Sequence, residues 1–221
     1  MARRITALKV QKRNPNRINV YLDGEFAFGL ARVVAAWLSI GQELDDEKVA
    51  AMQQEDTREI AYQSALRLLG VRPRTAAEIC RRLERQGFTQ PVMDDVIARL
   101  TESGLVNDRQ FAQTWVENRS TFRPRSHRLL ALELKRMGVA EEWIDGALED
   151  GAEDAALAYQ AAIKHARRLS GLDWMNFRTR LSGFLARRGF GYDVIQPVVR
   201  QVWQETHSEN DSRHDITEDE E

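Results

Sequence analysis

Arginine side chains are the groups in this 221-residue sequence best suited to bind a partner, and they greatly outnumber the lysines. The planar, permanently charged guanidinium group can bind a phosphate or a carboxylate through two hydrogen bonds at once. A single surface arginine needs no such explanation, but many on one face would form an anion-binding surface. The arginines gather in three stretches, Arg72–Arg85, Arg119–Arg136 and Arg167–Arg188.

We predict that the partner surface lies where the first two stretches meet, because basic residues are densest there. DNA phosphates and an acidic protein groove would both fit such a surface, and the residue types alone do not separate them. The predicted contact residues are Arg72, Arg74, Arg119, Arg123, Arg125, Arg128 and Arg136.

Residue types that perform catalysis form no recognisable motif in this sequence. It has no Gly-rich phosphate loop, no G-x-S-x-G and no H-E-x-x-H. The four histidines are scattered, and neither they nor Cys80 have the spacing of zinc ligands. We therefore expect no catalytic residue, no metal and no cofactor, and a binding or regulatory protein rather than an enzyme.

Composition favours a soluble protein of the cytoplasm. Hydrophobic residues make up 43% of the chain, and no apolar run approaches the ~20 residues that a membrane span needs. The first residues are charged and lack the apolar core of a secretory signal. Cys80 is the sole cysteine, which excludes an internal disulfide and suits a reducing compartment.

The arginine stretches fall within a sequence repeat that has a period of 51 residues. The recurring phrase is Leu-x-Arg-x-Gly followed by an apolar residue, and a fixed period of this size is typical of repeat proteins. Glycine readily adopts the left-handed conformation that ends a helix, and the next apolar residue packs back on the leucine. The three copies are Leu83–Phe88, Leu134–Val139 and Leu185–Phe190.

Each copy is predicted to contain one helix before the glycine, one after it, and a third helix ahead of the pair, which gives nine helices. Apolar residues recur in register on the helix after the glycine, as on one face of a helix. The leading helices are expected at about Asp56–Leu69, Asp108–Ser120 and Glu153–Leu169.

The first 45 residues follow a strand-like alternation instead. Asp23-Gly24 between two apolar runs is a strong hairpin signal. We predict a small antiparallel meander with a helix near Leu30–Leu38 behind it. The expected strands are Ile5–Gln11, Arg17–Leu22 and Glu25–Phe28, with a first turn at Asn14–Asn16.

The predicted fold is thus mostly α, with three tandem three-helix repeats in an elongated curved stack and a small N-terminal antiparallel β meander. The expected domains are 1–45 (meander plus helix), 46–104 (linker helix and first repeat), 105–151 (second repeat), 152–205 (third repeat) and 206–221 (a disordered acidic tail).

Charge is uneven along the chain. Residues 1–22 carry six basic side chains and no acidic one, whereas residues 205–221 carry eight acids against Arg213. The simpler interpretation of the acidic tail is that it keeps the protein soluble. The alternative is that it mimics nucleic acid and competes for the basic body.

Four segments resemble the bacterial RecX family. Arg72–Phe88 resembles the signature of its first repeat, Gly104–Trp115 looks like the next signature, and Arg125–Val139 continues the match. Asn19–Phe28 is similar to a β extension found in only some members. The resemblance covers about residues 5–205 and is weakest in the third repeat.

This resemblance implies a regulator of the RecA recombinase. Family members bind RecA–DNA filaments and restrain ATP hydrolysis, strand exchange and the cleavage that triggers the SOS response. The expected partners are the RecA filament and single- or double-stranded DNA, with no membrane, and the expected state is a monomer. The alternative is a free-standing DNA- or RNA-binding helical repeat that acts independently of RecA.

Overall fold

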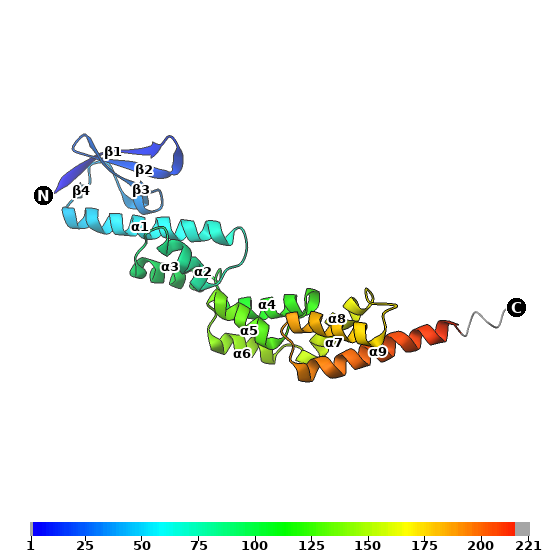
Figure 1. Cartoon of the computed structure of the whole chain (residues 1–221). Coiled ribbons are helices and arrows are strands. Elements are labelled where there is room, and N and C mark those ends of the chain that lie inside the picture. The colour runs from blue at the N-terminus through cyan, green and yellow to red at the C-terminus, as the bar shows by residue number, and fades with distance from the viewer. Residues whose placement is uncertain (1, 215–221) are drawn as a thin grey trace. The chain divides into compact units, whose positions relative to one another are not determined.

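A computed structural model describes the backbone of residues 2–214 and the side chains of residues 2–206. This part of the chain contains nine α-helices, as predicted, and one antiparallel sheet of four strands, of which the fourth was not among the three expected (Figure 1). The chain divides after Val106 into two compact units, and each is described by itself.

The N-terminal sheet is antiparallel, with the strand order β3-β2-β1-β4. Asp23 (φ 51°) and Gly24 (φ 93°) form the tight turn between β2 and β3, which confirms the predicted hairpin. The strands are β1 (Arg3–Gln11), β2 (Asn14–Leu22), β3 (Glu25–Ala31) and β4 (Glu43–Leu44).

Two local predictions about this region are wrong. The first turn lies at Lys12-Arg13, because strand pairing continues through the residues that were expected to form it. The predicted helix near Leu30–Leu38 is only a short 3₁₀ helix, η1 (Val34–Trp37), because β3 continues to Ala31.

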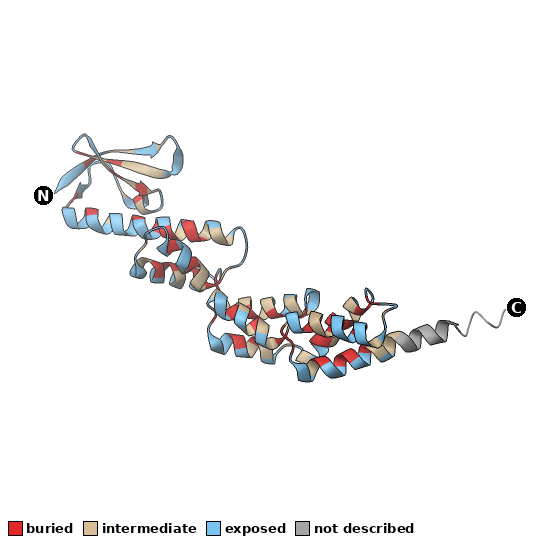
Figure 2. Cartoon of the chain, in the orientation of Figure 1, coloured by how far each residue is buried: buried red, intermediate tan, exposed pale blue. Residues whose placement is uncertain are grey.

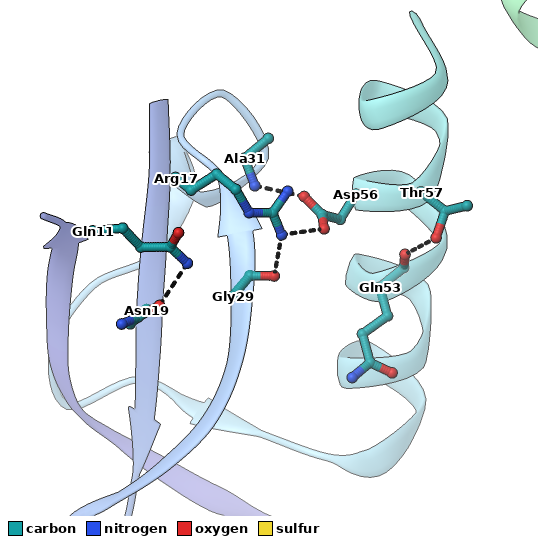
Figure 3. Close-up of polar contacts among 8 residues, drawn as sticks. All are labelled: Gln11, Arg17, Asn19, Gly29, Ala31, Gln53, Asp56 and Thr57. Atoms are coloured by element: carbon teal, nitrogen blue, oxygen red, sulfur yellow. Dashed lines mark hydrogen bonds and ion pairs between the residues drawn. The ribbon is translucent and has the colours of Figure 1, made fainter. Parts of the chain in front are cut away.

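The sheet is fixed to helix α1 (Asp46–Leu69) by a buried carboxylate (Figure 3). Asp56 lies 2.8 Å from Arg17 Nη2 and accepts a hydrogen bond from the Ala31 N–H at 2.5 Å. Arg17 also donates to the Gly29 carbonyl at 2.9 Å. Asp56 is only 7% exposed, so its two bonds satisfy a charge that would otherwise be costly to bury.

We expect Asp56→Ala to lower the free energy of unfolding by about 2 kcal/mol, because Arg17 and the Ala31 N–H lose their acceptor. Urea unfolding followed by circular dichroism measures the change. The matched control is Glu55→Ala, which removes an exposed pair with Arg58 and should cost less than about 0.5 kcal/mol. Equal losses in the two variants would contradict the role assigned to Asp56.

Three helices form each repeat. In the first, α1 is longer than predicted and starts at Asp46, with Asp45 capping its N-terminus through the Lys48 N–H. It is followed by α2 (Ala76–Glu84) and α3 (Gln90–Glu102). The second repeat is α4 (Asp108–Phe122), α5 (His127–Met137) and α6 (Glu141–Glu149), and the third is α7 (Asp154–Ala166), α8 (Trp174–Arg187) and α9 (Tyr192–His214).

The three glycines of the recurring phrase end equivalent helices, as predicted. Gly87, Gly138 and Gly189 have φ values of 88°, 86° and 90°. After each glycine, the next N–H donates to the carbonyl of the leucine five residues earlier, at 3.3, 3.1 and 3.4 Å. This bonding is the Schellman arrangement, which satisfies helix-end carbonyls and requires the left-handed conformation.

The repeat cores are built from residues in the same register. Leu83, Leu134 and Leu185 are fully buried. Two of the four predicted apolar positions on the third helix are buried in all three repeats, and Figure 2 shows buried residues on facing sides of the helices within a repeat. These positions are Met93, Ile144 and Ile195, followed three residues later by Val96, Ala147 and Val198.

The third repeat departs from the others at the start of its second helix. Asp173 caps α8 through the Asn176 N–H, so α8 begins one turn earlier than the period predicts. Phe177 consequently lies inside the helix and is buried at the register position that the capping residues Thr75 and Ser126 hold in the other repeats. This accounts for the weaker pattern there.

The C-terminal helix α9 continues to His214, nine residues past the predicted end of the ordered repeat. Residues 215–221 of the expected acidic tail lie outside the described residues, so their disorder stays a prediction. None of the helices in the described part of the chain combines the length and apolar character that a membrane span requires.

Candidate anion-binding site

The junction between the second and third repeats is fixed by three hydrogen bonds, each of which involves at least one main-chain group. The Ser126 N–H donates to the Arg188 carbonyl at 3.1 Å, and the His127 N–H donates to Asp154 Oδ1 at 2.7 Å. The Arg188 side chain returns a bond from Nη1 to the Pro124 carbonyl at 2.9 Å. These bonds position the start of α5 against the end of α8.

Four arginines line a hollow of about 400 Å³ at this junction. Two of them precede α5, and the other two end α8, where the negative end of the helix dipole favours a positive charge. The N-terminus of α5 lies nearby, and the positive end of its helix dipole adds to the positive field. The lining residues are Arg123, Arg125, Leu129, Phe184, Arg187 and Arg188, and none of these six is acidic.

The charges in the hollow repel one another. Burial and the neighbouring charges of Arg119 and Arg123 lower the pKa of Arg125. Burial together with Arg125 and Arg123 lowers the pKa of Arg188. Both groups remain charged at neutral pH because the guanidinium reference value is so high. A bound anion would relieve this repulsion.

Glu133 neutralises only one side of the cluster. Its Oε2 accepts a hydrogen bond from Trp115 Nε1 at 3.0 Å and lies 3.4 Å from Arg119 Nε, and its other oxygen pairs with Arg125. The Arg119 guanidinium also lies 4.3 Å from the centre of the Trp115 ring. Within the described side chains, no carboxylate pairs with the hollow's other three arginines.

Phe184 and Leu129 form the remaining wall. The Arg188 guanidinium lies 4.5 Å from the centre of the Phe184 ring, and the His165 ring stacks on Phe184 with the ring centres 3.8 Å apart. Burial, then Arg168, Arg188 and Arg187, lower the pKa of His165. The imidazole is therefore neutral at pH 7, and the positive charge of the site comes from the arginines.

The seven predicted contact residues do not form one group. Arg123 and Arg125 line the hollow, and Arg119 joins them through Glu133. Arg128 and Arg136 are exposed on α5 and do not line it.

The other two predicted residues, Arg72 and Arg74, belong to the first unit. Arg72 forms a two-pronged ion pair with Glu78, at 3.1 and 2.8 Å, and is largely neutralised. Arg74 donates from Nε to the Leu68 carbonyl at 3.2 Å and lines a smaller hollow of its own with Arg81, Arg82 and Arg85.

Sequence reasoning omitted Arg187 and Arg188 from the site. The repeat gave no signal for them, since Arg187 is the 51-residue equivalent of Arg136, which does not line the hollow. No group of three or more metal-binding side chains occurs among the residues whose side chains are described.

Four family models match this chain, and together they account for most of its length. The model described as the regulatory protein RecX N-terminal domain matches residues 3–45. The first, second and third three-helix domains of RecX match residues 61–100, 107–148 and 152–199.

Individual relatives agree with the family models. A regulatory protein RecX from Bacillus subtilis is 30% identical over 205 residues, which cover 90% of this chain and 76% of that protein. One from Mycobacterium sp. (strain KMS) is 38% identical over 150 residues, covering 64% of this chain and 80% of that protein. A crystal structure of regulatory protein RecX matches with a TM-score of 0.71 and 26% identity, over 89% of this chain and 98% of the other.

Proposed function

Because the chain belongs to the RecX family of regulatory proteins, we propose that it regulates the RecA recombinase. In this proposal it binds RecA and RecA–DNA filaments and mainly inhibits ATP hydrolysis, strand exchange and the coprotease activity of the SOS response. Family membership supports the partner, and the helical repeats support binding through a surface rather than catalysis. The protein would act in the cytoplasm, as a monomer and without a cofactor.

The arginine hollow between the second and third repeats is the observation that carries the proposal. Main-chain bonds fix the backbone at this junction, and the side chains of Arg188 and Arg125 are held by the Pro124 carbonyl and by Glu133, so little ordering of these groups is needed on binding. DNA phosphates and acidic side chains of RecA are both anions that guanidinium groups bind well. We propose that this hollow contacts the filament.

The direct test is the ATPase activity of RecA on single-stranded DNA. We expect the rate of ATP hydrolysis to fall as this protein is added, and to approach a low plateau at saturation. An unrelated DNA-dependent ATPase on the same DNA serves as the control and should keep its rate. If RecA keeps its full rate at saturating protein, or both enzymes slow equally, regulation of RecA is contradicted.

A free-standing DNA- or RNA-binding function is the second candidate, favoured by the six basic residues among the first 22. Salt separates the two candidates, because binding through phosphate contacts weakens steeply as salt rises. A RecA regulator should still bind filaments at a salt concentration that abolishes its binding to naked DNA. A protein that binds only DNA should lose both interactions together.

A further inference from the structure

One face of the N-terminal sheet carries an aromatic and cationic cluster. Tyr21 and Phe26 pair across β2 and β3, with ring centres 6.0 Å apart and nearly perpendicular planes. Lys9 on β1 lies with its Nζ 4.9 Å from the centre of the Tyr21 ring. We call these three residues the sheet-face cluster. They come from three adjacent strands, so they form one continuous surface.

Short polar side chains extend this surface along the strands. Gln11 donates to Asn19 Oδ1 at 2.7 Å, and both amides lie beside Gly29 (Figure 3). A Cβ atom at Gly29 would lie 2.9 Å from Gln11 Nε2, so the missing side chain gives the two amides their room. The result is a shallow polar floor next to the two rings.

The core of this module lies on the opposite face. Val20, Phe28 and Leu30 point there and pack with residues of η1 and α1. On the sheet-face side, by contrast, Phe26 is 58% exposed and Lys9 is also exposed. An exposed phenylalanine at this position contributes little to the core and is available to a partner.

Lys9 gives this face a positive charge, whereas Arg17, which lies beside Gly29, is neutralised by its pair with Asp56. Strand register puts Ala7, Lys9 and Gln11 on the sheet-face side of β1, with no carboxylate among its partners there on β2. Lys12 and Arg13 form the exposed turn at one end of the same strands. The acids Asp23 and Glu25 lie at the opposite turn.

We propose that this face binds single-stranded nucleic acid. A base would stack on Phe26 and on the edge of the Tyr21 ring. The amides of Gln11 and Asn19 would form hydrogen bonds with the polar edge of the base. The sugar-phosphate backbone would run from Lys9 toward Lys12 and Arg13. Aromatic rings beside cations on an open sheet suit this ligand, because every base has a flat face that can stack. An acidic peptide would use the cations but would give the exposed ring no role.

The test compares the affinity of the full-length chain for two probes, each 15 nucleotides long, at low salt. One is oligo(dT), and the other has the same phosphate backbone but no bases. We expect the protein to bind oligo(dT) at least several-fold more tightly, and Phe26→Ala to weaken that binding about tenfold while leaving the abasic probe almost unchanged. Lys9→Gln should weaken the binding of both probes.

Trp37→Ala is the matched control, because Trp37 is an exposed aromatic of the same module on η1, at 88% exposure. It should leave oligo(dT) binding unchanged, and thermal melting should show that all three variants fold. Equal affinity for the two probes, or full oligo(dT) binding by Phe26→Ala, overturns the proposal. So does equal weakening by Trp37→Ala.

This inference goes beyond the proposed regulation of RecA and is tested without RecA. Covalent photocrosslinking of an iodouracil-substituted probe to the strand that contains Phe26 would locate the contact independently. If RecA regulation fails while the crosslink forms, only the proposed function is lost. If regulation holds and no crosslink forms on this module, the sheet face is the part that is wrong.

Discussion

Replacing Arg123, Arg125 and Arg187 together by glutamine is expected to weaken the effect of this protein on RecA about a hundredfold. Each arginine lines the hollow at the junction of the second and third repeats. Losing about 1 kcal/mol for each charged contact gives about 3 kcal/mol, which corresponds to that factor. The measurement is the protein concentration that half-inhibits the RecA ATPase on single-stranded DNA.

The matched control removes the same charge from the same unit at exposed positions outside the hollow, with Lys135, Lys164 and Arg180 changed to glutamine. A general loss of positive field would affect both triple variants alike, whereas a specific site affects only the first. Both should melt within a few degrees of the parent, because Glu133 keeps Arg119 and Trp115 as partners. If the two triple variants inhibit RecA equally well, the interface does not lie at this junction.

Gly189→Ala is expected to cause the largest loss of stability of any single change considered. At a φ of 90° an alanine is strained by about 1–2 kcal/mol. Its methyl group would also lie 2.5 Å from Ser126 Oγ and 2.9 Å from Leu129 Cβ, and overpacking of this kind costs about 1–3 kcal/mol. Ser126 cannot simply turn away, because its hydroxyl caps α5. The midpoint of thermal unfolding should fall by about 10 °C or more.

Gly87→Ala separates the two causes. Gly87 has nearly the same φ, 88°, but no atom lies within 4 Å of the site where its Cβ would be. Its alanine variant should therefore show only the backbone strain of about 1–2 kcal/mol. If urea unfolding shows the same loss in the free energy of unfolding for both variants, the close approach of Gly189 to the second repeat does not contribute to that loss.

The repeat fold was predictable because its signals are local. A glycine that ends a helix, an apolar residue after it and a leucine before it lie within six residues, so the period is visible in the sequence. The N-terminal half of α1 was harder to assign. The buried residues Asp56 and Ala65 are nine positions apart, about 180° around the helix, so its buried face changes sides partway along it.

The candidate site was only partly predictable, since it depends on contacts between distant segments. Arg123 and Arg125 stood out by density, but Arg187 and Arg188 join them only because α8 ends against the start of α5. The pairing of Glu133 with Arg119 and Arg125 is equally invisible in the sequence. Charge density therefore suggested an anion-binding surface, and the fold determines which of the arginines lie together.

Helix α1 contributes to two separate cores. Val49 and Met52 belong to the core of the sheet, and Ala61 and Ala65 belong to the core of the first repeat. The family models likewise leave residues 46–60 between the N-terminal domain and the first three-helix domain. A deletion or insertion of coding sequence ahead of about residue 60 would therefore leave the repeat core complete. The sheet, together with any ligand that it binds, can therefore be added or lost during evolution at this point of α1 without changes to the repeats.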